Sequence, residues 1–404
     1  MALTTTATDV VAFYERVYTP KKIMSLALKD APLTAYLPKD TSGSGENVTV
    51  RLLDKEMGGV GTTLSAAITA EKDPGAKKVI LDYKKFYTST SLTNDAIELS
   101  EGNAITNMLK LAVESSMRNH GDQLESSLWG PVSGYIGRIA TGGISGNVVT
   151  LTNANDCFNF EPDDIIIFDD TITGASPRAG SAVVASVQYD AGTVTFVDLG
   201  TVTSEAAGDY LFKSTFENGA GPIGIQSWIP VTAPTAGDAF GTGSLDRSLN
   251  PTRLAGWRYS ASAGMSVKTA IIRGLSYGKN FGGRADTIFM STDRMADLVL
   301  ELGNQVVYDS MGSKEFQVNF RTVKFVGPQG DIQAVVAPKC PNNSMWALER
   351  SSWSIKSVGE LVRNPIRNNK VIDSELEDGV RLRWKTFYAL TCHLPGHNGV
   401  ITVS

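Results

Sequence analysis

The sequence has few of the residues from which enzyme and metal sites are usually built. It contains only three histidines and three cysteines in 404 residues. Cys157, Cys340 and Cys392 lie far apart and form no Cys-x-x-Cys or Cys/His ligand spacing. They therefore indicate neither a zinc site nor a disulfide framework, and they suit a reducing compartment.

Long apolar runs and long basic runs are also absent. No basic segment followed by an apolar core opens the chain, and no apolar stretch is long enough to span a membrane, so we expect no signal peptide, transmembrane helix or membrane partner. The net charge is −5, from 37 basic and 42 acidic residues. Strong nonspecific binding of nucleic acid is therefore not expected.

The histidines offer little for metal binding or catalysis. His393 and His397 have the i, i+4 spacing of a metal-binding pair, but Pro395 and Gly396 interrupt it, and no acidic residue stands nearby in sequence. A solvated loop is the favoured interpretation. His120 is predicted to be a partly buried residue of a helix.

Two other kinds of motif could carry chemistry. The glycine-rich stretches Gly274–Gly283 and Phe240–Ser244 lack the Lys-Ser/Thr ending of a phosphate loop, and we interpret them as loops. The acidic pairs Asp163-Asp164 and Asp169-Asp170 do not have EF-hand spacing and fit turns at strand ends. Gly274–Gly278 has Gly-x-Ser-x-Gly spacing, but no nucleophile elbow is predicted there. The sequence thus predicts no catalytic, cofactor-binding or metal-binding residues and no enzyme.

The most regular segment is a long amphipathic helix predicted over residues 103–129. Asn103 offers an N-cap, and Gly130-Pro131 ends the helix. Its apolar residues recur at the spacing of one helical face, which we expect to be buried: Ile105, Met108, Leu109, Ala112, Val113, Met117, Leu124 and Leu128.

An arm and an extended hairpin precede this helix. Within residues 1–45, short helices are predicted at 10–17 and 21–29, the second ended by Ala31-Pro32. Strands Asn47–Leu53 and Lys77–Ser91 then enclose a polar, alanine-rich tip. A strand pair with so little apolar surface is marginal alone. It packs either on its own domain or on a neighbouring subunit, and the pattern leaves both open.

A block of short strands follows the helix. The turn residues between them predict a small antiparallel barrel or sandwich, and Asp190-Ala191-Gly192 predicts a three-residue hairpin loop. Trp129-Gly130-Pro131 before the block and the Gly/Pro-rich 219–225 segment after it would join as one linker, so we interpret the block as an inserted domain. Its predicted strands are Asn147–Thr152, Asp164–Asp169, Ala182–Tyr189, Thr193–Leu199 and Asp209–Lys213.

The remaining sequence predicts an α/β block and C-terminal strands. Helices are expected at Ser266–Lys279 and from Ser291 or Thr292 to Gly303. The predicted strands are Thr287–Met290, Phe316–Phe320, Thr322–Val326, Ile332–Ala337, Met345–Leu348, Val380–His393 and Val400–Val403.

This order of parts resembles the major capsid proteins of tailed bacteriophages, the HK97-like family. The Gly221-Pro222-Ile223-Gly224-Ile225 segment is similar to the family's linker after its spine helix, and Pro338–Leu348 is similar to its late axial strand pair. Thr287–Met290 before a helix is similar to its axial strand, with Ser291-Thr292 where Asn-Pro is common. The resemblance implies an α+β, HK97-like fold with an inserted antiparallel β-barrel or sandwich. Its parts would be an N-terminal arm (1–45), an E-loop (46–92), a spine helix and peripheral domain (93–136), the inserted β-domain (137–215), an axial domain (216–365) and C-terminal return strands (366–404).

The resemblance also implies a function. The chain would be a major capsid protein that self-assembles, as hexamers and pentamers, into an icosahedral head shell around double-stranded DNA. Implied partners are portal and scaffolding proteins, a decoration protein, and DNA that is contacted weakly; no cofactor is implied. It would be assembled in the host cytoplasm and reside in the virion. An encapsulin-type nanocompartment shell and a β-rich tail, baseplate or decoration protein are the alternatives. A Lys–Asn cross-link cannot be assigned, although Lys84 and Lys85 lie in the predicted E-loop.

Overall fold

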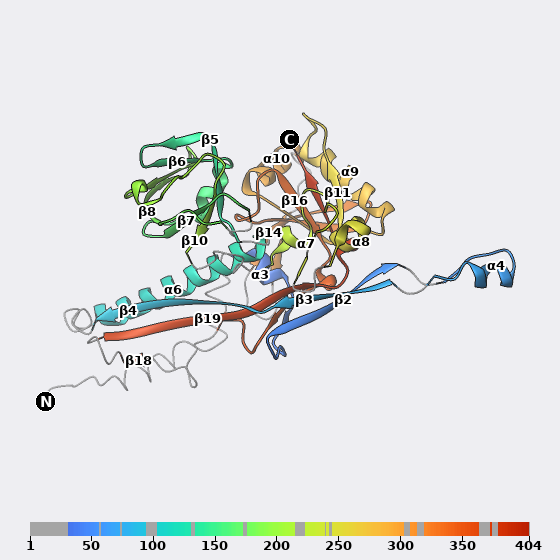
Figure 1. Ribbon diagram of the computed structural model, residues 1–404, viewed down its shortest axis with the longest axis horizontal. Coiled ribbons are helices and arrows are strands. Elements are labelled where there is room, and N and C mark those ends of the chain that lie inside the picture. The colour runs from blue at the N-terminus through green and yellow to red at the C-terminus, as the bar shows by residue number, and fades with distance from the viewer. Residues whose placement is uncertain are drawn as a thin grey trace.

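The fold is known from a computed structural model, in which helices and sheets are mixed (Figure 1). Figure 1 shows the strands β4 and β19 and the helix α6 running side by side along the longest axis, with the barrel and the α/β block on one side of them. A hairpin projects from the far end. The structure describes residues 31–55, 58–72, 75–93, 103–130, 134–172, 176–214, 223–238, 240–241, 245–302, 308–312, 319–362, 372–373 and 379–403.

The predicted long helix is confirmed as α6 (Asn103–Trp129). It packs on β4 (Lys84–Thr93) and β19 (Gly379–Cys392), which pair antiparallel in a sheet with β1 (Lys39–Asp40), β17 (Trp353–Ser357) and β18 (Ile372–Asp373). Its predicted apolar face is fully buried at Val113, Met117, Leu124 and Leu128. The side chains of residues 103–111, including Ile105, Met108 and Leu109, lie outside the description.

The hairpin differs from its prediction in the second strand. β2 (Asn47–Lys55) pairs with β3 (Gly75–Asp82), and a helix, α4 (Leu64–Thr69), forms in the tip. The predicted strand Lys77–Ser91 is interrupted at Tyr83, after which β4 pairs with β19 instead. The alternation changes phase after Tyr83, because two polar residues, Lys84 and Lys85, separate it from the buried Phe86. The prediction of one continuous strand missed this signal.

The predicted barrel is confirmed as a closed six-stranded barrel in the order β10-β5-β6-β9-β8-β7. Gly192 has a φ of +65°, as the predicted hairpin loop requires. The strand β5 was missed because Gly142 and Gly143 interrupt its pattern and its pairing with β6 shifts register. The strands are β5 (Gly137–Ser145), β6 (Val148–Leu151), β7 (Ile165–Asp169), β8 (Ala182–Gln188), β9 (Thr193–Phe196) and β10 (Tyr210–Lys213), with 3-10 turns η1 (Ala154–Asn159) and η2 (Leu199–Thr201).

The α/β block is built on a seven-stranded mixed sheet in the order β11-β20-β16-β12-β15-β14-β13. The C-terminal strand lies inside this sheet, parallel to β11 and antiparallel to β16. The strands are β11 (Trp257–Ser260), β12 (Thr287–Met290), β13 (Tyr308–Gly312), β14 (Asn319–Gly327), β15 (Gly330–Val336), β16 (Ser344–Leu348) and β20 (Gly399–Thr402), and the helices are α7 (Ile225–Trp228), α8 (Pro251–Ala255), α9 (Val267–Asn280) and α10 (Thr292–Leu302), with 3-10 turns η3 (Arg247–Leu249), η5 (Arg350–Ser352) and η6 (Pro395–His397).

One interpretation of a glycine-rich segment was wrong. The predicted helix Ser266–Lys279 is confirmed as α9 (Val267–Asn280), so residues 274–280 are its second half and not a loop. Gly274 and Gly278 let the helix approach Ile401 and Trp257 closely. Pro32 begins a helix that was not predicted, α3 (Pro32–Tyr36), at the position where a missing N–H costs nothing. The helices predicted at 10–17 and 21–29 lie outside the described residues.

Buried apolar side chains gather in three clusters. The largest joins α3, the base of the hairpin, α6 and the five-stranded sheet, and a second lies under α9 and α10. The third contains residues 136–211 alone and fills the barrel. The strand β17 belongs to the five-stranded sheet although it precedes the predicted boundary at 365. No helix among the described residues is long and apolar enough to span a membrane.

Candidate functional site

The groups from which catalytic and metal sites are built are dispersed in this fold. Among the described residues, no three His, Cys, Asp or Glu side chains lie close enough to hold a metal ion. Cys157, Cys340 and Cys392 are all buried, and burial raises the pKa of each thiol, that of Cys157 to about 11. The thiols are therefore protonated and poorly nucleophilic at neutral pH.

His120 is a structural residue, and it is more deeply buried than predicted. Its side chain is fully inaccessible and lies between Thr88 of β4, whose Oγ1 is 2.8 Å from Nδ1, and Thr386 of β19, whose Oγ1 is 2.6 Å from Nε2. The ring stacks on Phe86 at 4.4 Å between ring centroids. Burial lowers the pKa of His120 to about 3, so the imidazole is neutral and joins the helix to the sheet.

The other two histidines do not form a metal site together. His393 is exposed, as predicted for a solvated loop. His397 Nδ1 lies 2.5 Å from Glu349 Oε2, an acidic partner too far away in sequence for the spacing to predict. The pair bridges the loop before β20 to the end of β16.

The acidic pairs stabilise turns, as predicted. Asp169 is buried at the end of β7, and its carboxylate accepts hydrogen bonds from the backbone N–H groups of Thr171 and Ser176 at 2.6 and 2.9 Å. Asp164 forms an ion pair with Lys213 at 2.9 Å. Asp163 adopts a positive φ of 69° in the turn before β7.

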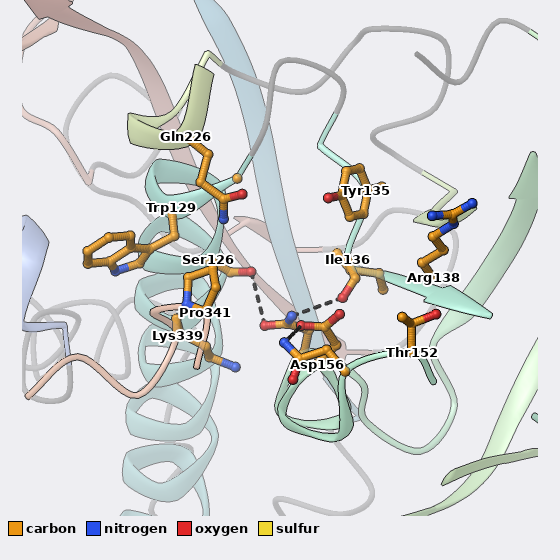
Figure 2. A pocket seen from close by; sticks show the side chains of 13 residues that line it. Ser126, Trp129, Tyr135, Ile136, Arg138, Thr152, Asp156, Gln226, Lys339 and Pro341 are labelled. Carbon is orange, nitrogen blue, oxygen red and sulfur yellow. Dashed lines mark hydrogen bonds between the residues drawn. The ribbon is translucent and has the colours of Figure 1, made fainter. Parts of the chain in front are cut away.

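A cleft of about 230 Å³ separates the barrel from the body of the protein (Figure 2). Figure 2 shows the end of α6 and Lys339 on one side of the cleft and Tyr135, Arg138 and Asp156 on the other. Asp156 accepts a hydrogen bond from Asn153 Nδ2 at 3.0 Å, and burial raises its pKa to about 7.

Hydrogen bonds cross from the barrel to the body around this cleft. Lys339 Nζ donates to the carbonyl oxygen of Phe158, and Asn155 Nδ2 donates to Asp293 Oδ2 at 3.3 Å. These two hydrogen bonds hold the barrel against the body. The described lining contains no nucleophile paired with a general base.

Glu125 is a second buried polar centre that sequence reasoning missed. Its carboxylate accepts hydrogen bonds from the N–H groups of Leu33 and Thr34, both at 2.9 Å, from Thr34 Oγ1 at 2.6 Å and from Trp129 Nε1 at 3.2 Å. Burial raises the pKa of Glu125, while these four hydrogen bonds favour the ionised form. Glu125 therefore holds α3 against the long helix. A glutamate on an otherwise apolar face of the predicted helix was the sequence signal that could have indicated this buried polar residue.

The hairpin has a buried base and an exposed tip. Its base packs on the chain's own core: Val50, Leu52 and Val79 are buried, and Asn250 Nδ2 donates to the carbonyl oxygen of Asp54 at 3.0 Å. The interpretation that the hairpin packs on its own chain is therefore confirmed for its base.

The tip is different. The helix α4 has no buried residue, and Val60, Leu64 and Ile68 are 96%, 78% and 57% exposed. Figure 1 shows this tip far from the rest of the molecule. Exposed apolar side chains on a projecting segment are typical of a surface that another protein covers.

Comparisons with known proteins give structural likenesses only. No family model matches the sequence, and no curated protein matches it. The chain is similar to a chain of the cyanophage A-1(L) capsid asymmetric unit, with 13% identity, 93% of each chain covered and a TM-score of 0.48. It is similar to the capsid of Myoviridae phage XM1 (8% identity, 92% of this chain and 91% of that chain, TM-score 0.44) and to a virus-like particle from Pyrococcus furiosus (9%, 97% and 100%, 0.42).

Proposed function

We propose that this chain is the major capsid protein of a tailed bacteriophage and that many copies of it form the shell of the head. The observation that carries the proposal is the hairpin, whose base belongs to its own subunit while its tip exposes Val60, Leu64 and Ile68. A second copy that covers the tip would remove this apolar surface from water. Burial of apolar area contributes roughly 25 cal/mol per Å².

The shape of the subunit supports a shell. The helix α6 and the strands β4 and β19 form an elongated unit along the longest axis, and the hairpin extends from its end (Figure 1). An elongated unit with a projecting hairpin can overlap its neighbours and tile a thin wall. In this assignment the hairpin is the E-loop, α6 is the spine helix of the peripheral domain, and the seven-stranded sheet with α9 and α10 is the axial domain.

The inserted domain is assigned to the six-stranded barrel. Its separate core and its position beside α6 are the support for this assignment. It is joined to the body through the hydrogen bonds around the cleft in Figure 2.

The proposed partners follow from the role. Other copies, in hexamers and pentamers, would form the shell, with portal and scaffolding proteins for assembly, a decoration protein on the outer surface and double-stranded DNA inside. The protein would be assembled in the host cytoplasm and would reside in the virion. No enzymatic step is part of it, and no observation among the described residues favours a nanocompartment shell over a phage head.

Electron microscopy of the purified full-length chain tests the proposal. We expect closed, icosahedral shells or, before closure, hexamers and pentamers. A protein that remains monomeric at every concentration and salt condition tested, alone and with a co-expressed scaffolding protein, would rule out the shell function.

A further inference from the structure

The paired strands β4 and β19 have two faces of different character. One face packs on α6: Trp384 Nε1 donates to Ser116 Oγ at 2.9 Å, and Thr386 contacts His120. Because side chains alternate along a strand, the neighbouring residues point away from the helix. On this outer face, cross-strand register places Lys85 opposite Phe387, Tyr87 opposite Lys385, and Ser89 opposite Arg383. We call this set the outer ribbon face.

The charge on this ribbon has one sign. The segments 84–93 and 379–392 contain five Lys or Arg and no Asp or Glu, within a chain whose net charge is −5. Lys85, Arg383 and Lys385 of the outer ribbon face form no ion pair with the described residues. Cations gathered on one face of an acidic protein indicate a site for an anionic partner.

Aromatic rings separate these cations. Lys85 Nζ lies 4.7 Å from the ring centroid of Phe387, and Lys385 Nζ lies 5.3 Å from that of Tyr87 and 5.5 Å from that of Phe387. A ring orients an ammonium group but does not neutralise its charge. Tyr87 is 57% exposed, and the Ser89 hydroxyl is also on the surface. Cations and hydroxyl groups are the side chains that bind phosphate oxygens.

We propose that the outer ribbon face binds the phosphate backbone of double-stranded DNA without reading its sequence. The paired segment extends from Lys84↔Tyr388 to Thr93↔Gly379. At about 3.4 Å per residue it is about 34 Å long, which is about one turn of B-DNA. Only one face is available, because α6 covers the other, so the ribbon lies along the backbone and does not enter a groove. The choice of DNA over an acidic protein segment rests on the proposed function, in which the shell encloses DNA.

DNA binding by the unassembled full-length chain tests the proposal. Fluorescence anisotropy would follow a labelled duplex of about 30 base pairs between about 20 and 200 mM salt. The test variant is Lys85→Gln, Arg383→Gln and Lys385→Gln together. The matched control is Lys78→Gln, Arg273→Gln and Lys279→Gln, which removes the same charge from exposed positions on the hairpin and on α9.

Each neutralised phosphate contact contributes about −0.9 to the slope of log Kobs against log salt concentration. We expect the test variant to have a slope shallower by about 2.7 and a weaker affinity at every salt concentration. The control variant should keep most of the wild-type slope. Equal slopes for the wild type and the test variant, or no DNA binding by the wild type, would overturn the proposal. Tighter binding of polyglutamate than of the duplex would also overturn it and would assign the face to an acidic protein segment.

Electron microscopy of the same preparations separates this proposal from the shell function. Shells without DNA binding would contradict only the outer ribbon face. DNA binding that depends on Lys85, Arg383 and Lys385 without shells would contradict only the shell function.

Discussion

His120 and Glu125 are polar residues in the core, and both join the long helix to elements that are distant in sequence. His120 contacts Thr386, 266 residues away, and Glu125 contacts Thr34, 91 residues away. Helical periodicity predicts that this part of α6 is buried, but it carries no information about which side chain satisfies a buried polar group. The sequence therefore predicted a partly buried histidine, whereas the side chain of His120 is completely buried.

Because the pKa of His120 is lowered to about 3 by burial, its neutral form is favoured in the folded state. An unfolded chain binds a proton at this histidine below about pH 6.5, whereas the folded chain does not until about pH 3. His120 therefore removes stability as the pH falls through this window, by up to about 1.4 kcal/mol per pH unit.

The variant His120→Gln keeps a donor and an acceptor but does not titrate. Between pH 6.5 and 4, its free energy of unfolding, measured by urea denaturation, should fall less steeply than that of the wild type, by about 1 kcal/mol per pH unit. Curves that run parallel over this range would show that His120 is not held neutral.

At the scale of elements, α9 shows how packing overrides local propensity. A Cβ at Gly278 would lie 2.4 Å from Trp257 Cε2, and a Cβ at Gly399, on the adjacent strand β20, would lie 2.1 Å from Trp257 Cδ2. The indole is therefore enclosed by two glycines. Helical periodicity predicted this helix as far as Lys279, whereas the glycine content of residues 274–283 favoured a loop. The contact joins distant segments, so the sequence could not show that small residues are needed here inside a helix.

Alanine normally stabilises a helix relative to glycine by about 1 kcal/mol. At Gly278, overpacking against an enclosed ring costs about 1–3 kcal/mol, so Gly278→Ala should on balance lower the free energy of unfolding by up to about 2 kcal/mol. The exposed position Ser276 provides the control, and Ser276→Ala should change stability by less than about 0.5 kcal/mol. Thermal or urea denaturation would measure the stability of both variants relative to the wild type. A Gly278→Ala variant more stable than the wild type would contradict close packing of Gly278 on Trp257.

The barrel gives a second prediction at this scale. Its strands close on themselves, so no edge is left unpaired, and its core contains residues 136–211 alone. Residues 134–214 expressed alone should therefore fold and give dispersed amide NMR signals. A random-coil spectrum would mean that the barrel depends on the body across the cleft in Figure 2.

Periodicity and turn residues predicted most helices and strands of the described chain, including α6, the barrel strands other than β5, and β12. They could not predict pairing. The change of partner at Tyr83 and the position of β20 between β11 and β16 are set by contacts between segments far apart in sequence. Packing of the hairpin on a neighbouring subunit was only one of two alternatives that the sequence left open, because the strand pattern does not show where the packed base ends and the exposed tip begins.

At the scale of the whole molecule, the base and the tip of the hairpin differ in their packing. The hairpin base is part of the subunit core, and the tip is free to contact something else. Removing the tip should therefore not unfold the subunit, because α4 has no buried residue and the pairs Val48↔Leu81 and Val50↔Val79 remain.

The most direct test is electron microscopy of shell assembly by the wild type and by a chain in which Gly58–Gly75 is replaced by a short glycine-serine turn, compared under identical conditions. The account predicts shells from the wild type. It predicts that the deleted chain is soluble, with wild-type near-ultraviolet circular dichroism and a similar melting temperature, but remains as monomers or isolated capsomers. Normal shells from the deleted chain would contradict the claim that a neighbouring copy covers the hairpin tip.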